Sequence, residues 1–462
     1  MTITTSIIPN KLQFAKKAKT EHALHLEAIC IFVATGFFMD EDTYWRDLVC
    51  LSPAHCHELD VEGYLIKSTP TFQWHYTPRD ISFETALKEY IALFTKICKE
   101  QVKDSQVILP LSGGLDSRSQ ALIFKNLDNP VQAFSYAFQD GYPEHLIAKR
   151  IATACDFDFD SFTIPRSYLW DSIESLSQLL DGYSEFTHPR QMAVLPKLKQ
   201  MDGVFSLGHW GDVFFDRGVP EGLQESDVIP YLLKKMVKPK GLELANKLWQ
   251  HWGFEEEFKP YLITRIQTSL NRIKIDNLSA KVRAFKSNQW AHRWTTTNLC
   301  IFEAAHPITT PYYDDRMCEF ICGIPEEYLA DRRLQIAHLK QDALLSNITW
   351  QEQKPFNLNN YHFNKTPYNL PYRILNKLKR VKLNLIGRPY IQRNWELQFL
   401  GDANAKQLER YLFDTDFNQW IPQALIKEVY DDFKHDNAVA SSHAISMLLT
   451  LSLWHQKYVD AV

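Results

Sequence analysis

The sequence predicts an α/β fold: a doubly wound parallel sheet with a helical C-terminal half and a small β-rich unit at the N-terminus. Strand-like apolar runs alternate with helix-like segments between residues 107 and 207, the pattern of a parallel sheet covered by helices. A glycine-rich loop joins the first of these runs to the first helix that follows it. Since ligands bind beyond the carboxyl ends of the strands in such sheets, we expect the functional site there.

The expected elements follow from the spacing of apolar residues. Apolar side chains recur three and four positions apart over residues 82–102, which predicts a helix that Ser82 caps. The expected strands are the short apolar runs at 107–111, 131–136, 161–164 and 204–207. The helices expected between and after them are at 117–125, 144–155, 168–180, 229–237, 241–252, 329–345 and 437–458.

The first 80 residues have a different pattern from the rest. Short β-like runs at 28–33, 63–66 and 71–76 lie among turn residues. The chain of 462 residues is about three times the usual length of a domain. We therefore expect a small β-rich unit over residues 1–80 and a larger α/β domain over residues 81–462.

The composition is that of an ordinary soluble protein, with 45% hydrophobic and 23% charged residues. A net charge of −4 gives no sign of a nucleic-acid or membrane partner. The eight cysteines form no C-x-x-C pair, which favours reduced thiols over disulfides or a zinc site. The first residues lack the pattern of a signal peptide, and we expect a cytoplasmic protein.

Residues 112–117, Ser-Gly-Gly-Leu-Asp-Ser, lie between a predicted strand and a predicted helix. Gly113 and Gly114 allow a positive φ and a close approach of the main chain, so that successive N–H groups point at one phosphate. The helix N-terminus adds partial positive charge, and Ser112 and Ser117 add hydroxyl donors. Asp116 would repel a phosphate, so we expect it to hold a bridging Mg²⁺. The sequence lacks both G-x-x-x-x-G-K-[ST] and G-x-G-x-x-G.

This loop resembles the S-G-G-x-D-S motif of the PP-loop ATP pyrophosphatases, which cleave ATP between the α- and β-phosphates. Together with Leu111 it is most similar to the synthetase domain of glutamine-dependent asparagine synthetases. Residues 206–215 resemble the S-G-E-G-x-D-E-x-F motif of that family, with Gly208 and Asp212 at matching positions. Residues 310–314 resemble its P-F-L-D segment, and residues 340–344 and 350–356 resemble its K-x-x-L and R-x-K-x-x-F pair.

The resemblance implies an adenine-nucleotide α-hydrolase-like (PP-loop) fold and an amide-forming ligase. Such an enzyme uses ATP and Mg²⁺ to turn a carboxylate into an acyl-adenylate. It implies that Asp116 and Asp212 hold the metal and that Lys354 stabilises the developing oxyanion and pyrophosphate. The fold implies that adenine lies against the ends of the first two strands, near Leu111, Phe134 and Ser135.

Two positions depart from the family pattern. His209 replaces a glutamate that deprotonates the amine in some members, and it is either a base or a packed, inert residue. Pro307 replaces a second glutamate, for which Glu303 or His306 would have to compensate. A binding or scaffold protein that keeps the fold but has reduced catalytic activity is therefore an alternative. Adenylation of a tRNA base is another, and the near-neutral charge argues against it.

The N-terminal region resembles only the tail of a glutaminase domain, at residues 48–76. The chain begins Met1-Thr2, and its first cysteine is Cys30, so the cysteine nucleophile of glutamine-dependent members is missing. Too little of the domain is present for Thr2 to serve instead. The amine then comes from ammonia, from a separate glutaminase, or from the substrate itself, as in relatives that form macrolactams or β-lactams. We expect the carboxylate to belong to a small molecule or a peptide, with a separate glutaminase or a carrier or leader as the candidate partner.

Basic residues are concentrated at 376–393, where six of them alternate with apolar residues: Lys377, Lys379, Arg380, Lys382, Arg388 and Arg393. This stretch is either a solvated helix face or a docking surface for an acidic peptide or a glycan intermediate.

Overall fold

The computed structural model describes residues 3–5, 12–351, 354–387 and 391–458. Its centre is a five-stranded sheet in the order β10-β9-β6-β7-β8, and every neighbouring pair in it is parallel. The five strands are β6 (Val107–Pro110), β7 (Val131–Phe138), β8 (Asp158–Ile164), β9 (Val204–Ser206) and β10 (Ile308–Thr309). The expected doubly wound parallel sheet is confirmed.

Helices cover both faces of this sheet because the strands are apolar on both sides. Along β6, Val107 and Leu109 belong to one buried cluster and Ile108 belongs to the other. On the first face lie α2 (Phe83–Val102), α3 (Leu115–Lys125) and α4 (His145–Cys155). On the second face lie α5 (Tyr168–Leu180) and α12 (Thr296–Glu303). Successive residues of a strand point to opposite faces of the sheet, and in a doubly wound sheet helices bury both faces.

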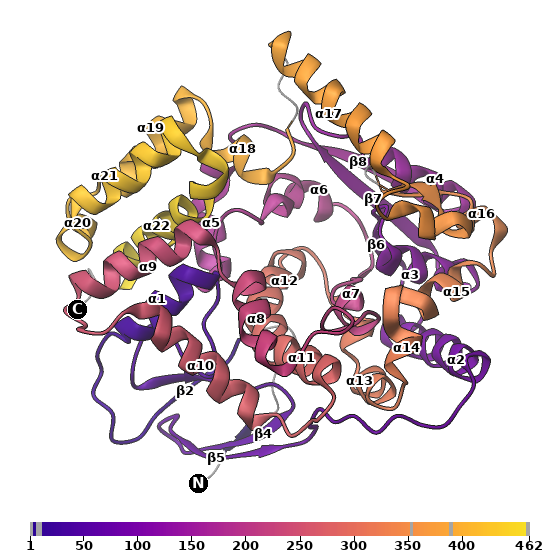
Figure 1. The fold of residues 1–462 in the computed structure, drawn as a ribbon, viewed down its shortest axis with the longest axis horizontal. Helices are drawn as coiled ribbons and strands as arrows, with labels where there is room; N and C mark the ends of the chain where they lie inside the picture. The colour runs from indigo at the N-terminus through magenta and orange to yellow at the C-terminus, as the bar shows by residue number, and fades with distance from the viewer. Residues whose placement is uncertain (1–2, 6–11, 352–353, 388–390, 459–462) are drawn as a thin grey trace.

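The second half of the chain is helical, as expected (Figure 1). Its helices are α6 (Leu195–Leu198), α7 (Gly211–Phe214), α8 (Val228–Met236), α9 (Pro239–His251), α10 (Phe258–Arg272), α11 (Leu278–Lys286), α13 (Asp315–Cys322), α14 (Glu326–Leu329), α15 (Arg333–Leu339), α16 (Ala343–Ser346), α17 (Leu370–Leu385), α18 (Asn394–Phe399), α19 (Asp402–Leu412), α20 (Phe417–Trp420), α21 (Gln423–Asp431) and α22 (Ala438–Tyr458). The expected single helix over 329–345 is wrong, because Asp331 and Arg332 have φ values of 55° and 62° and end one helix before α15 begins.

The N-terminal region contains short antiparallel strands and one helix. The strands are β1 (Ile3–Thr5), β2 (Phe14–Lys16), β3 (Leu48–Cys50), β4 (His55–Leu59) and β5 (Leu65–Pro70). They form a three-stranded sheet in the order β1-β4-β5 and a separate β2-β3 pair. The strand expected at 71–76 is wrong, since that stretch is extended without strand partners.

The strand expected at 28–33 is also wrong, because these residues lie in helix α1 (Leu26–Thr35). Every residue from Ala28 to Ala34 is fully buried, so the run is apolar on all sides and has no periodicity that would separate a helix from a strand. The helix packs in the same core as α9 and α22, and His443 of α22 hydrogen-bonds the Val33 carbonyl at 3.0 Å. The division at residue 80 stays a prediction.

In the part of the chain that the structure describes, no helix combines the length and apolar character that crossing a bilayer demands.

Candidate active site

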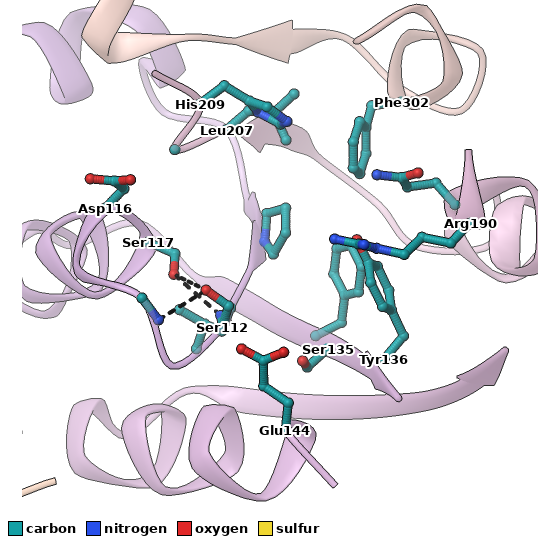
Figure 2. Close-up of a pocket in the computed structure, with 16 residues that line it drawn as sticks. Ser112, Asp116, Ser117, Ser135, Tyr136, Glu144, Arg190, Leu207, His209 and Phe302 are labelled. Atoms are coloured by element: carbon teal, nitrogen blue, oxygen red, sulfur yellow. Dashed lines mark hydrogen bonds between the residues drawn. The ribbon is translucent and has the colours of Figure 1, made fainter. Parts of the chain in front are cut away.

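A pocket opens at the carboxyl ends of β6, β7 and β9. The chain runs from β6 to β7 and β8 on one side, and β9 then pairs with the other side of β6, so strand order reverses at β6. Such a switch point leaves a crevice between the diverging connections. The cavity measures about 240 Å³ (Figure 2). Of the predicted site residues, the following line it: Leu111, Ser112, Gly114, Asp116, Ser117, Phe134, Ser135, Gly208 and His209.

The loop between β6 and α3 is held by its own polar groups. The Ser112 N–H donates to Ser117 Oγ at 3.2 Å, and the Gly114 N–H donates to Ser112 Oγ at 3.1 Å (Figure 2). Neither Gly113 nor Gly114 has the positive φ that glycine allows, and Gly114 is extended at φ −67° and ψ 166°. Glycine at position 114 instead allows the main chain to lie close to the Ser112 side chain, because a Cβ there would lie 3.1 Å from Ser112 Oγ. The loop therefore presents its main chain at the start of α3.

Arg118 ties this loop to the chain that leads to Lys354. The side chain is fully buried in α3, and its Nη2 donates to the carbonyls of Gly113 at 3.0 Å and Thr349 at 2.9 Å. Its Nη1 donates to the carbonyls of Ile348 at 3.1 Å and Leu345 at 3.4 Å. Thr349 begins strand β11 (Thr349–Gln351), which pairs with β12 (Lys354–Asn357). One guanidinium thus fixes the glycine loop relative to the hairpin that carries Lys354.

Asp116 lies in the first turn of α3 and is held from the opposite side of the cleft. Its Oδ1 accepts hydrogen bonds from Arg332 and from Gln335, the latter at 2.9 Å. Burial raises the pKa of Asp116, the charge of Arg332 lowers it, and the nearby Asp212 carboxylate raises it further. The two predicted metal-holding carboxylates therefore lie close enough to repel each other. A cation between them would relieve that repulsion.

The backbone around Asp116 is unusually strained. Trp210, Asp331 and Arg332 all have positive φ, at 74°, 55° and 62°. Each such residue costs roughly 1–2 kcal/mol. The Asp331 N–H donates to Asp216 Oδ1 at 2.9 Å, which helps to hold the turn that carries Arg332. Strain of this kind persists where the surrounding structure imposes a precise arrangement, and functional sites are where it gathers.

The loop after β9 crosses the start of α3 through two glycines. A Cβ on Gly208 would lie 2.9 Å from Gln120 Oε1 and 3.2 Å from the Ser117 N. A Cβ on Gly211 would overlap the Asp116 carboxylate and lie 2.9 Å from Tyr312 Cζ. Gln120 also donates to Ser206 Oγ at 2.9 Å. These contacts explain why glycine occupies both positions in a motif that precedes Asp212.

The Gly211→Ala variant is expected to displace the Asp116 carboxylate. The added methyl group has no room, and overpacking of this kind costs about 1–3 kcal/mol. We expect ATP turnover to fall about 10- to 100-fold, because small displacements of reacting groups have effects of this size. The matched control is Gly323→Ala, where the nearest atom to a Cβ is Arg79 Nε at 3.3 Å in a flexible side chain. Equal turnover in the two variants would show that this contact does not position Asp116.

The residues present fit a magnesium ion only in part. Asp116 and Asp212 supply two carboxylates, and Asp212 is exposed at the start of α7. Within the described ranges, no group of three or more His, Cys, Asp and Glu side chains is placed to hold a metal. Mg²⁺ in nucleotide sites commonly uses one or two carboxylates and takes its remaining ligands from phosphate and water. The pair suits that mode and does not suit an all-protein cage.

Lys354 lies outside the pocket lining. It is the first residue of β12 and is partly buried. Burial lowers the pKa of Lys354, and the charge of Arg332 lowers it further, while Asp216 raises it. Arg332 therefore places a cation on the Asp116 carboxylate, and Lys354 lies near enough to Arg332 for the two charges to interact, so an anion close to both would be stabilised.

His209 lines the pocket across from the glycine loop, next to Phe302 (Figure 2). Burial lowers the pKa of His209 to about 4, although Asp212 acts to raise it. The imidazole is therefore neutral at pH 7 and a weak proton acceptor. Among the described residues, its Nδ1 has no hydrogen-bond partner. This position fits a group that contacts a bound molecule better than it fits a strong general base.

Sequence reasoning missed several residues of the site. Arg190 begins the 3₁₀ helix Arg190–Val194 and lies 5.3 Å above the Tyr136 ring, and both line the pocket with Glu144 (Figure 2). Lys286 has a pKa lowered to about 8 by burial and by Lys235, and it interacts electrostatically with Asp212. Neither Arg190 nor Lys286 lies in a sequence motif, and no spacing of residues in the sequence points to either of them.

The remaining family-like segments take structural positions. Asp314 caps α13 by accepting from the Arg316 N–H at 3.1 Å. The Tyr312 hydroxyl donates to the Asp116 carbonyl at 3.3 Å, so residues 310–314 support the start of α3. Lys340 is exposed and lies 5.5 Å from the centre of the Tyr361 ring. His306 Nε2 hydrogen-bonds the Leu198 carbonyl at 3.0 Å, before β10 begins and at the end of the sheet away from the pocket.

Comparison with known proteins identifies the segment that contains the loop. Residues 90–204 match the asparagine synthase family. The resemblance that residues 111–117 indicate is thereby confirmed for the stretch from α2 to β9, whereas the glutaminase-like N-terminal remnant stays a prediction. The asparagine synthase match ends before Gly208, Asp212 and Lys354, so their roles rest on the geometry above.

No curated protein matches the chain. Among solved structures, an NMN synthetase from Francisella tularensis is similar at 15% identity, with a TM-score of 0.23, over 45% of this chain and 93% of that chain. This likeness is too weak to carry an argument. The asparagine synthase match itself supports an ATP-dependent activity of ligase or amidation type.

Proposed function

We propose that this protein is an ATP-dependent carbon–nitrogen ligase that activates a carboxylate as an acyl-adenylate, with release of AMP and pyrophosphate. One observation carries the proposal. The loop at residues 112–117 presents its main chain and hydroxyls at the switch point of a parallel sheet, and the two neighbouring carboxylates Asp116 and Asp212 lie beside it. A helix N-terminus binds phosphate, and a metal ion held by adjacent carboxylates bridges phosphate oxygens. Together these two features are suited to a nucleoside triphosphate.

The lining of the pocket supports an assignment for each part of the nucleotide. Phe134 and Ser135 lie within β7 beside Leu111, whose N–H donates to the Phe134 carbonyl at 2.8 Å, and we assign the adenine to this part of the pocket. The triphosphate then extends over Ser112 towards Asp116. Mg²⁺ on Asp116 and Asp212 would neutralise charge on the phosphates.

We assign two cations, Arg332 and Lys354, to the negative charge that develops in this reaction. Attack of a carboxylate on the α-phosphorus forms a carboxylate–phosphorus bond and breaks the bond to the β-phosphate oxygen, so pyrophosphate leaves with added negative charge. Arg332 already bonds Asp116, and Lys354 lies near Arg332. Fixed positive charge of this kind is the main catalytic contribution available to the chain.

Two sources of the amine are open. We propose ammonia, free or from a separate glutaminase, or an amino group of the substrate, which would make the protein a cyclase of the macrolactam or β-lactam type. The neutral His209 beside the pocket would accept a proton only weakly, whereas Lys286 beside Asp212 loses its proton near pH 8. A catalytically reduced protein that only binds ATP is the second candidate, which the weak basicity of His209 favours.

The Lys354→Gln variant is expected to lower kcat about 100-fold with little change in the KM for ATP, because the lost charge acts on the leaving pyrophosphate. Lys365→Gln is the matched control, since Lys365 is exposed and pairs with Asp331 at 2.7 Å. We expect less than about a twofold change there. Steady-state pyrophosphate release measures both, and equal effects of the two variants would remove Lys354 from the proposed chemistry.

The function itself is tested by a screen for pyrophosphate release with Mg-ATP. Amino acids, peptides and sugar acids are supplied in turn, each with and without ammonia and glutamine. The proposal predicts release that depends on one class of carboxylate. ATP binding by calorimetry without release for any carboxylate would favour the binding protein, and no binding at millimolar ATP would contradict both.

A further inference from the structure

Helix α17 exposes most of its apolar side chains. Among the described residues, fourteen large apolar side chains are exposed, and eight of these lie between residues 368 and 386. The eight are Tyr368, Leu370, Ile374, Leu375, Leu378, Val381, Leu385 and Ile386. Leu385 is 81% exposed and Leu375 is 64% exposed. Single exposed leucines are ordinary on a protein surface, whereas a contiguous group marks an interaction site.

Five of these eight side chains form one stripe along the helix. Leu370, Ile374, Leu378, Val381 and Leu385 are spaced by four, four, three and four residues. At 3.6 residues per turn they fall within roughly 80° of the circumference, over a length of about 22 Å. The partly buried residues lie on the other side, which is the side that faces the body of the protein: Tyr372, Asn376, Arg380 and Leu383.

All the charged residues of α17 are positive. Its cations are Arg373, Lys377, Lys379, Arg380 and Lys382. The sequence has no aspartate or glutamate from residue 353 to residue 395. Where side chains are described, none of the five cations pairs with a carboxylate, while Lys365 just before the helix pairs with Asp331. The net charge of −4 for the whole chain averages over this local excess.

The helix lies at the edge of the molecule and projects from it (Figure 1). Its orange ribbon extends away from α4 and α16, and its last turn is among the outermost parts of the view. A second copy of α17 would bring like charges together, which disfavours self-association. The occupant must therefore be anionic, must accept apolar side chains, and must suit a convex ridge.

We propose that α17 binds an anionic lipid surface and lies in its plane. The leucine stripe enters the headgroup region, and the lysines and arginines meet the lipid phosphates beside it, which is how basic amphipathic helices bind membranes. A bilayer needs no groove of matching shape, whereas an acidic protein partner would need one. The inference goes beyond the proposed ligase activity, since it requires neither ATP nor an active site.

Vesicle flotation with the full chain tests this surface. The probes are vesicles of phosphatidylcholine alone and vesicles with about 30% phosphatidylglycerol, at about 0.1 M salt and at about 0.5 M salt. We expect flotation only with the anionic vesicles, and at least a tenfold weaker binding at high salt. The double variant Leu378→Gln, Leu385→Gln and the triple variant Lys377→Gln, Lys379→Gln, Lys382→Gln are each expected to weaken binding at least tenfold.

Matched substitutions separate α17 from the rest of the surface. Ile66→Gln with Val439→Gln changes two apolar residues elsewhere that are 57% and 54% exposed, and Lys88→Gln with Lys427→Gln changes two other exposed lysines. Both controls should bind vesicles as the parent does. Circular dichroism should show every variant folded, because all the replaced side chains are exposed.

Three results would overturn the proposal. The first is a parent protein that does not float with anionic vesicles, and the second is flotation that both α17 variants retain. The third is binding of an acidic, leucine-containing peptide, measured by fluorescence anisotropy, that depends on α17 in the absence of vesicle binding. That result would assign the helix to a protein partner instead.

Discussion

The Asp116→Asn variant is expected to reduce pyrophosphate release about 1,000-fold or more. Asparagine keeps the size of the side chain and its ability to accept from Arg332 and Gln335, but it removes the negative charge that would hold Mg²⁺ beside Asp212. Loss of metal-based charge stabilisation on a transferring phosphoryl group is worth several kcal/mol. Steady-state release with saturating carboxylate measures the effect.

The same substitution is expected to leave stability unchanged or to increase it. Burial raises the pKa of Asp116, so the folded state favours the protonated carboxyl, and stability is lost as pH rises through the interval between the unfolded and the folded pKa. At neutral pH the ionised Asp116 therefore costs stability, and asparagine removes this cost. A thermal melt at pH 7 without nucleotide should show an equal or higher Tm.

Asp314→Asn is the control for this pair of expectations. Asp314 caps α13 and pairs with Arg316 at 2.8 Å, and its motif lies near Asp116 through Tyr312. We expect a loss of about 1 kcal/mol in stability and no large change in release. If Asp116→Asn retained full release while Asp314→Asn lost it, the metal assignment would be wrong.

The Arg118→Met variant is expected to destabilise the fold by several kcal/mol, since each buried acceptor that loses its donor costs about 1–3 kcal/mol. Methionine fills much of the volume but leaves the carbonyls of Gly113, Leu345, Ile348 and Thr349 without these donors. Urea unfolding followed by tryptophan fluorescence measures the change.

Arg150→Met separates this role from simple loss of positive charge. Arg150 is exposed on α4, and its charge contributes, after burial, to lowering the pKa of Arg118 to about 10. Removing it should change stability by less than about 0.5 kcal/mol. A similar small effect for Arg118→Met would show that its four carbonyl contacts do not hold the loop to the β11–β12 hairpin.

The sheet and its loop were accessible from the sequence because their signals are local. Residues 131–136 are mostly apolar, include Val131, Phe134 and Tyr136, and lie within β7. Residues 168–180 have a three- and four-residue period and form α5. The loop at 112–117 is a continuous motif whose chemistry depends on neighbours in sequence. Periodicity failed at residues 28–33, where α1 is buried on every side.

The second half of the site depends on contacts between distant segments. Arg332 and Gln335 reach Asp116 across more than two hundred residues, and Arg332 does so from a left-handed backbone that no local preference predicts. The family-like segment that begins at Lys340 gave no sign of Arg332, and Lys340 itself lies exposed on the Tyr361 ring. A motif with loose spacing fixes the order of segments but not which of two neighbouring basic residues faces the cleft.

The bond that is cleaved in ATP tests the central claim most directly. The full-length protein, Mg-ATP labelled on the α- or the γ-phosphate and the carboxylate found in the screen are incubated together, and the products are separated by chromatography. The account predicts AMP and pyrophosphate in equal amounts, both lost with Asp116→Asn. Formation of ADP and phosphate would contradict it, because residues 112–117 would then not serve cleavage between the α- and β-phosphates.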